Sequence, residues 1–308
     1  MSHPPLNVQR ALDDASGRFA IQVRHPASLQ GARQTGFVWT RQPGVLCLAM
    51  SRDYLAQAQR NPDVIAIVAP PAVADHCVDE TKALIVCDRA DELFHHLHLS
   101  QDPFADTTQD RFEIDDTAEV DASALLRGHV RIGAGARIGP GVVISGPASV
   151  GRDASIEARA VVGCDGLYAK TVLGVRRHMP HFGGVEIGDS SRILAGAVVV
   201  RSAIHGEVTR VGAGACVGVL SNIGHDTTIG DGATISSNVV VAGRSTVGAH
   251  AWIGASATIS NMVDIGERAE VRLGAVVLQD VPAGGDVSGN FARSHAANMR
   301  RFLEDIRK

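Results

Sequence analysis

The sequence has 308 residues, with 29 Lys and Arg against 33 Asp and Glu, and a formal net charge of −4. This charge balance argues against nucleic-acid binding, and no apolar run approaches the roughly 20 residues of a membrane-spanning helix. The amino-terminal segment MSHPPLNVQRALDDASG has acidic residues and no apolar stretch, so we do not expect a signal peptide. Five scattered cysteines without a CxxC pair indicate reduced thiols, and we therefore expect a cytoplasmic protein without a membrane span.

Residues 1–113 are predicted to form a small α/β domain. Apolar runs that predict buried strands alternate with segments of helical composition, a pattern typical of this class. Ser51 is the expected N-cap of the first helix. The segments in chain order are VLCLAM (45–50), SRDYLAQAQRNP (51–62), VIAIVA (64–69), ALIVC (83–87), ADELFHHLHL (90–99) and a polar linker (100–113).

A six-residue repeat follows. Steps of six from Ile114 to Val162 and from Ile187 to Val277 meet Ile, Val or Leu at 24 of 25 positions. Neither a helix nor a simple strand has this period, whereas a triangular coil of three short parallel strands per turn does. The β-branched residue points inward, and Gly permits the tight corners. We predict a mainly β fold, a parallel β-helix of about eight coils over 114–283, followed by a turn and a short helix over 284–308.

Two irregularities interrupt the repeat. The stretch 163–186 contains bulky and charged residues that cannot continue the coil, so it is predicted to be an extruded loop, and long loops on a repeat scaffold usually have a function. His205 is the one polar residue in the second register. Because a buried unpaired imidazole is costly, we expect residues around 202–209 to bulge out of the coil.

Several segments resemble the hexapeptide-repeat acyltransferases. The resemblance is closest to UDP-3-O-acylglucosamine N-acyltransferase of lipid A biosynthesis and to relatives that N-acylate nucleotide-linked amino sugars. It implies a left-handed β-helix, a homotrimer with active sites in grooves between coils, and acyl-CoA or acyl carrier protein as thioester co-substrate, with no tightly bound cofactor or metal. The segments, besides the hexads and 45–99, are VVGCDGLY (161–168), MPHFGGVEIGD (179–189), NIGHDTTIG (222–230) and VVVAG (239–243).

The resemblance also implies a catalytic set. His225 is the expected general base, Asp226 its orienting neighbour, and the backbone N–H of Gly243 the donor to the oxyanion. The chemistry agrees, because an amine that attacks a thioester must lose a proton and imidazole accepts one at neutral pH. The alternatives are a solvated corner histidine and an ordinary corner glycine.

Further residues are expected to bind the substrates. Tyr54 matches one of two aromatic residues that enclose the uracil in the lipid A enzyme, while the other position holds Leu48. The ending DVSGNFA (286–292) resembles the part of CoA-dependent sugar acyltransferases near which pantetheine lies, which implicates Gly289 and Asn290. The candidate sugar or diphosphate contacts in the extruded loop are Tyr168, Arg176, His178, His181 and Phe182.

Departures from the lipid A enzyme decide between the alternatives. Met262 stands where that enzyme has a second histidine linked to the acyl substrate. Together with Leu48, this favours a sugar N-acyltransferase of surface polysaccharide, lipopolysaccharide or O-antigen synthesis over the lipid A enzyme itself. Two other classes stay open: a non-catalytic trimeric scaffold, and a zinc carbonic anhydrase, for which the spacing of His205, His225 and His250 does not fit.

Overall fold

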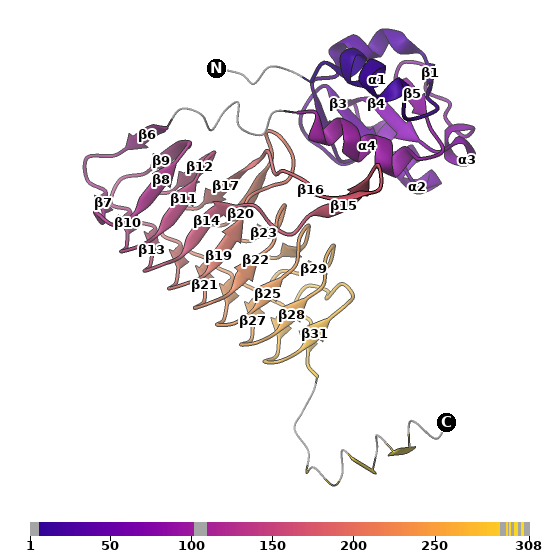
Figure 1. Ribbon diagram of the computed structural model, residues 1–308. Coiled ribbons are helices and arrows are strands. Elements are labelled where there is room, and N and C mark those ends of the chain that lie inside the picture. Colours follow the sequence, from indigo (N-terminus) through magenta and orange to yellow (C-terminus); the bar gives the residue numbers. More distant parts are fainter. Residues whose placement is uncertain are drawn as a thin grey trace.

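The computed structural model describes residues 6–101 and 110–289, together with 294, 296, 299–300 and 303–304 (Figure 1). A small domain at the amino-terminal end lies beside a long triangular prism, and the hairpin β15–β16 extends from the prism toward helix α4 (Figure 1). The predicted carboxy-terminal helix and Asn290 lie largely outside the described residues.

The amino-terminal domain is a five-stranded sheet in the order β1-β5-β4-β3-β2, in which only β1 runs antiparallel to its neighbour among the described strands. Helices α1 and α4 pack on one face, and α2 and α3 pack on the other. Its elements are α1 (Val8–Ser16), β1 (Gln22–Arg24), the 3₁₀ helix η1 (Pro26–Gly31), β2 (Gln34–Gly36), β3 (Val45–Leu48), α2 (Arg52–Arg60), β4 (Val64–Ala69), α3 (Pro71–Ala74), β5 (Ala83–Val86) and α4 (Ala90–Leu99).

The strands and helices predicted in this domain from the alternating pattern are confirmed. The run VIAIVA forms the central strand β4 and is almost entirely buried, as expected for a strand covered on both faces. Helix α2 begins after Ser51, whose hydroxyl accepts a hydrogen bond from the backbone N–H of Tyr54 at 3.2 Å.

The prism is a left-handed parallel β-helix, as predicted, with three sheets that we name after their first strands. The β6 face contains β6 (Arg111–Ile114), β9 (His129–Ile132), β12 (Ala148–Val150), β17 (Gly184–Ile187), β20 (Val208–Val211), β23 (Thr228–Ile229), β26 (Thr246–Val247) and β29 (Asp264–Ile265). The β7 face contains β7 (Glu119–Val120), β10 (Arg137–Ile138), β13 (Ser155–Ile156), β18 (Arg192–Ile193), β21 (Cys216–Val217), β24 (Thr234–Ile235), β27 (Trp252–Ile253), β30 (Glu270–Val271) and β32 (Asp286–Val287). The β8 face contains β8 (Leu125–Arg127), β11 (Val143–Ser145), β14 (Val161–Cys164), β19 (Val198–Val200), β22 (Asn222–Ile223), β25 (Val240–Val241), β28 (Thr258–Ile259) and β31 (Val276–Val277).

The apolar hexad residues build the core of the prism. Each of the 24 lies in one of these strands and stacks on its counterpart one coil away, as Ile223 does on Val241. His205 is not in this stack. Val199 and Val211 are the inward residues of successive strands, and the six extra residues between them leave the coil, so the predicted bulge is confirmed.

The extruded segment is more ordered than the loop predicted from the sequence. Strand β14 continues to Cys164 and β17 starts at Gly184, and between them β15 (Ala169–Val172) and β16 (Val175–His178) form an antiparallel hairpin. Its two turn residues, Leu173 and Gly174, both have positive φ, which suits the twist of a two-residue hairpin. The missed signal is the pairing of AKTV with VRRH across Leu-Gly.

Among the described helices, none combines the length and the apolar character needed to cross a membrane.

Candidate active site

His225 and Asp226 occupy the corner between β22 and β23. Asp226 has a φ of 59°, in the left-handed region that Asp tolerates better than most other residues. This corner brings the neighbouring side chains together, with Nδ1 of His225 2.7 Å from Oδ2 of Asp226. Because adjacent residues in a strand point to opposite faces, the pair depends on its position at the corner.

Asp226 is held as a carboxylate. Its Oδ1 accepts a short hydrogen bond from the Ser202 hydroxyl, and its backbone N–H donates to Thr209 Oγ1 at 2.9 Å. Burial opposes ionisation, but the hydrogen bonds from His225 and Ser202 and nearby positive charge outweigh it and hold the pKa of Asp226 below its usual range. A carboxylate accepts only, so Nδ1 of His225 carries a proton and Nε2 is left as the acceptor.

Gly243 lies one coil beyond His225 and against its ring. A Cβ at this position would be 2.7 Å from Nε2 of His225, so any larger residue would displace the imidazole. Neither Nε2 of His225 nor the backbone N–H of Gly243 hydrogen-bonds to a described residue. An unoccupied acceptor therefore stands beside an unoccupied backbone donor.

Two side chains of the extruded segment enclose the imidazole. The ring of Tyr168 lies nearly parallel to that of His225, at 15° and 6.2 Å between centroids. The ring of His181 meets it edge to face at 5.4 Å. His181 is buried, and neither of its ring nitrogens has a hydrogen-bond partner among the described residues. Burial and the neighbouring His225 lower the pKa of His181 to about 4, so it is neutral at physiological pH.

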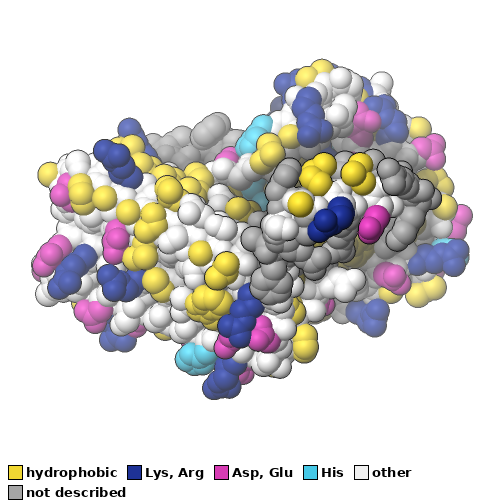
Figure 2. Space-filling view, turned by 90° about the horizontal axis from the view of Figure 1, so that it is seen from below, with side chains coloured by type: hydrophobic (Ala, Val, Ile, Leu, Met, Phe, Trp, Pro, Cys, Tyr) yellow, Lys and Arg dark blue, Asp and Glu magenta, His cyan; other side chains and the backbone are white. Residues whose placement is uncertain are grey.

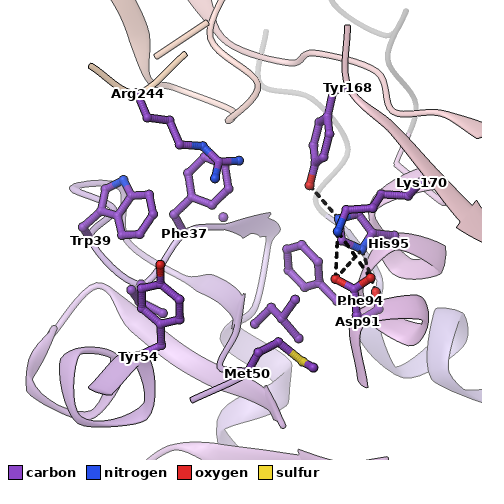
Figure 3. A pocket seen from close by; sticks show the side chains of 13 residues that line it. Phe37, Trp39, Met50, Tyr54, Asp91, Phe94, His95, Tyr168, Lys170 and Arg244 are labelled. Carbon is purple, nitrogen blue, oxygen red and sulfur yellow. Dashed lines mark hydrogen bonds and ion pairs between the residues drawn. The ribbon is translucent and has the colours of Figure 1, made fainter. Parts of the chain in front are cut away.

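A pocket of about 250 Å³ opens near the pair His225–Asp226, which we call the dyad, between the amino-terminal domain and the prism (Figure 3). One wall holds Arg244, at the corner one coil beyond Asp226, with its guanidinium 4.0 Å from the ring centroid of Phe37. Arg244 makes no ion pair with a described carboxylate, and its Nε is buried without a partner. Trp39 stacks on Phe37 at 5.0 Å and is 42% exposed, and Tyr54 lies 6.2 Å from Trp39.

The opposite wall is polar. Tyr168, His95, Asp91 and Lys170 lie together there (Figure 3), and Lys170 Nζ is 3.1 Å from a carboxylate oxygen of Asp91. The pocket thus offers an aromatic surface and an unpaired cation on one side and hydrogen-bonding groups on the other. An anionic ligand with a planar ring fits this lining.

The structure brings together most, but not all, of the predicted site residues. His225, Asp226, Gly243, Tyr168 and His181 form one cluster, and Tyr54 lines the adjacent pocket.

The other predicted site residues lie at the edge of this cluster or away from it. Arg176 is exposed on the hairpin, and Phe182 is buried between the rings of His98 and His205. His178 donates from Nε2 to the carbonyl oxygen of Gly166 at 2.9 Å, and its ring stacks on that of His181 at 6.2 Å between centroids. Gly289 follows β32, several coils from His225, and Asn290 is outside the described residues.

Sequence reasoning missed several of the lining residues. It looked for a second aromatic residue at Leu48, whereas the structure places Trp39, from the loop after β2, beside Tyr54 in the pocket. It also passed over Phe37, His95, Lys170 and Arg244. The available signal was the run GFVW, since three large apolar residues directly after a glycine in a polar surrounding suggest a binding surface.

No group of three His, Cys, Asp or Glu side chains that could hold a metal ion is found within residues 6–101 and 110–289. All five cysteines are free thiols.

Comparisons with known proteins extend these observations. Residues 129–164 match the bacterial transferase hexapeptide family (six repeats). The bifunctional protein GlmU of Anaeromyxobacter sp. (strain Fw109-5) is 29% identical over 188 residues, which is 54% of this chain and 37% of that protein. The chain therefore spans well under half the length of this curated relative.

Among solved structures, the UDP-N-acetylglucosamine acyltransferase of Francisella novicida gives a TM-score of 0.49 at 23% identity, over 63% of this chain and 72% of that chain. The perosamine N-acetyltransferase of Caulobacter crescentus, solved with CoA and GDP-perosamine, gives a TM-score of 0.23 at 20% identity, over 56% and 53%. The predicted resemblance is confirmed at the level of the repeat: residues 129–164 match the bacterial transferase hexapeptide repeat, and the parallel sheets of the prism continue the same period on both sides of this segment.

Proposed function

We propose that the protein is an N-acyltransferase that moves an acyl group from a thioester to the amine of a nucleotide-linked amino sugar. One observation carries the proposal: Nδ1 of His225 is held by Asp226 while Nε2 is unoccupied beside the free backbone N–H of Gly243. A scaffold without catalysis would have no use for a largely buried carboxylate beside an imidazole at this corner, because removing a carboxylate from water costs free energy.

In the proposed reaction, the amine nitrogen attacks the carbonyl carbon of the thioester, and Nε2 of His225 takes the proton that the amine loses. Asp226 stabilises the resulting imidazolium. The backbone N–H of Gly243 donates to the oxyanion of the tetrahedral intermediate. The carbon–sulfur bond then breaks, and the thiolate leaves with the proton from His225.

The pocket is the proposed site of the nucleotide. The base stacks on Trp39 and Tyr54, and the guanidinium of Arg244 binds the diphosphate. Arg244 directly follows Gly243 in the chain, so a phosphate bound to it lies close to the dyad. The sugar amine then reaches Nε2 of His225 from the pocket side.

The donor is the thioester of coenzyme A or of acyl carrier protein, and we propose that the active molecule is a homotrimer. The donor and the acceptor are to be identified by thiol release. Acetyl-CoA, longer acyl-CoAs and hydroxyacyl carrier protein would each be offered with UDP-, dTDP- and GDP-linked amino sugars, to the wild type and to His225→Ala. Asp231→Asn, which alters an exposed aspartate on a neighbouring corner, is the control.

We expect release with one donor and one free-amine nucleotide sugar, and a fall in kcat of about 10²–10⁴-fold in His225→Ala with the oligomer intact. Release only with carrier protein and a UDP-acylglucosamine would assign the protein to lipid A synthesis instead. A His225→Ala variant that keeps more than a tenth of the wild-type turnover would remove His225 from the role of base.

A further inference from the structure

Helix α4 of the amino-terminal domain is hydrogen-bonded to the segment that encloses His225. Nε2 of His95 is 2.6 Å from the hydroxyl oxygen of Tyr168, and Nδ1 of His95 is 2.6 Å from the backbone carbonyl oxygen of Asp91. His95 is buried, and its ring meets the Tyr168 ring edge to face, with 5.6 Å between the ring centroids. Neither the expected catalytic steps nor the nucleotide contacts use this histidine.

The direction of these hydrogen bonds follows from the groups involved. A carbonyl oxygen only accepts, so Nδ1 of His95 donates to it, and the neutral ring then accepts at Nε2 from the Tyr168 hydroxyl. Burial lowers the pKa of His95 and raises the pKa of Tyr168 to about 12, which keeps the ring neutral and the hydroxyl protonated. The chain of donors therefore runs without conflict from Tyr168 through His95 to Asp91.

At the Tyr168 end, this series of hydrogen bonds lies beside His225, the proposed general base. A single hydrogen bond from Nδ1 to Asp226 leaves the His225 ring free to pivot, unless neighbouring groups fix its plane. The Tyr168 ring lies nearly parallel to it, and His181 stands edge to face with both. The Tyr168 ring thus lies beside the His225 imidazole, while its hydroxyl hydrogen-bonds to His95.

The same side chains line the nucleotide pocket. The polar side of the pocket is formed by Asp91, His95, Tyr168 and Lys170 (Figure 3). A ligand bound in the pocket would therefore contact Tyr168, which lies beside the His225 ring, and His95, which hydrogen-bonds to Tyr168. Binding energy gained far from the reacting amine can then be used to fix the catalytic imidazole.

We propose that His95 is a positioning residue: through Tyr168 it fixes the plane of the His225 imidazole and so makes the transfer rate depend on the amino-terminal domain. This inference rests on the proposed function for its kinetic test. A chemical test that needs no acyl transfer is therefore paired with it.

The kinetic test uses His95→Leu, Tyr168→Phe and the double variant, with His96→Leu as the matched control. His96 is the next residue of α4, is half-buried, and packs on Phe19 at 5.7 Å, with no hydrogen bond to Tyr168. We expect each single variant to lower kcat about tenfold, the KM of the thioester donor to stay constant, and the double variant to equal the single ones, because both remove one hydrogen bond. His96→Leu should keep the wild-type kcat.

The chemical test measures carbethoxylation of His225 by diethyl pyrocarbonate, quantified by peptide mass spectrometry on the full chain. We expect His225 to react several-fold faster in His95→Leu and Tyr168→Phe than in the wild type and in His96→Leu. If the wild type transfers no acyl group but this difference is found, the positioning stands and the proposed function fails. Unchanged reactivity of His225, or a lowered melting temperature with unchanged kcat, would overturn the positioning role.

Discussion

The carboxylate of Asp226 determines which nitrogen of His225 is available for chemistry. It receives hydrogen bonds from His225 and from Ser202, and its backbone is fixed by Thr209, so the side chain has little freedom to rotate. A group in this position orients the imidazole and stabilises its cationic form without itself accepting the proton. The function proposed for the site depends on this charge.

Replacing Asp226 with Asn tests that charge at constant size. The amide retains a hydrogen bond with Ser202 but can donate to Nδ1, which favours the tautomer with its proton on Nε2. We expect kcat to fall about 10²-fold or more, with a small change in KM, as measured by steady-state thiol release. Ser202→Ala should lower kcat less, and the two changes should not be additive, because both act through the same carboxylate. Retention of half the wild-type kcat in Asp226→Asn would contradict the orienting role.

Gly243 provides a steric test at the same site. In Gly243→Ala the new Cβ would lie 2.7 Å from Nε2 of His225, so the imidazole must move. We expect a loss of at least tenfold in kcat with little change in melting temperature, because φ at this position is not in the left-handed region. Gly17→Ala is the control, since a Cβ there meets nothing within 4 Å. An active Gly243→Ala enzyme would show that the close approach is not required.

At the scale of elements, the prism could be predicted and the pocket could not. An inward residue such as Ile223 is followed six positions later by another apolar residue in the same environment. The period of the β-helix can therefore be read from the spacing of apolar residues in the sequence. The pocket joins a loop after β2, helix α4, the hairpin and a corner of the prism, and no periodic pattern links these segments. The contact between His225 and Asp226 also required the corner backbone, because sequence adjacency alone does not bring side chains together.

A tryptophan in the pocket allows nucleotide binding to be measured by fluorescence. Trp39 is partly exposed beside Arg244, while the second tryptophan, Trp252, lies in β27. In a Trp252→Phe background, we expect UDP, dTDP or GDP to quench the fluorescence of Trp39 to saturation, because the base stacks on the indole. Adding Arg244→Gln should weaken the binding about tenfold, since the diphosphate loses its cation. Adding Arg131→Gln, on the exposed β6 face, should not. Equal titrations with and without Arg244 would place the diphosphate elsewhere.

His98, a buried histidine of helix α4, leads us to expect that the stability of the protein depends on pH. His98 is fully buried between Thr35 Oγ1, at 2.7 Å, and the carbonyl oxygen of Pro180, at 2.9 Å, and its titratable neighbours include His95 and Tyr168. Burial lowers the pKa of His98 to about 4, against about 6.5 in an unfolded chain. Between these two pH values, His98 is protonated in the unfolded chain and neutral in the folded protein. The free energy of unfolding therefore decreases as the pH drops from 6.5 toward 4.

We expect this histidine to cost on the order of 2 kcal/mol of stability at pH 5 relative to neutral pH. His181, whose pKa is also lowered to about 4, adds an effect of the same sign. The melting temperature of the wild type should therefore fall between pH 7.5 and pH 5. His98→Gln should fall less steeply, and His76→Gln, which removes an exposed histidine, should follow the wild type. Parallel curves for all three proteins would rule out this source of acid sensitivity.

At the scale of the whole molecule, the three faces of the prism differ in their outward residues. The outward positions of the β6 and β7 faces include charged residues such as Arg210 and Glu270. On the β8 face, the outward residue directly before each inward residue is uncharged in all eight strands, and Arg127, at the end of β8, is a charged outward residue at one end of the face. Hydrophobic side chains are visible at the surface beside basic and acidic ones (Figure 2). The outward residues directly before the inward ones on the β8 face are Leu125, Val143, Val161, Val198, Asn222, Val240, Thr258 and Val276.

A second copy of the chain is the occupant that we propose for the β8 face. Apart from Arg127, which lies in the strand at one end and is 3.4 Å from a carboxylate oxygen of Asp110, these outward positions are uncharged and repeat along the prism, so they can pack against an equivalent surface without burying an unpaired charge. His225 lies two residues after the end of β22 on this face, so a copy packed here would close the site from the outside. Self-association and catalysis should therefore be lost together.

Val161→Lys tests this coupling by placing a charge in β14, the third strand of the β8 face from its β8 end. We expect the wild type to form a trimer of 32.3 kDa chains by light scattering, and the variant to dissociate and to lose most of its kcat, because a buried lysine without a partner opposes association. Ser155→Lys, six residues earlier in the same coil but on the β7 face, is the control and should remain trimeric and active. Circular dichroism would show that both variants stay folded. A monomeric wild type, or a folded Val161→Lys variant that remains trimeric, would show that the β8 face does not join the copies and that the site is complete within one chain.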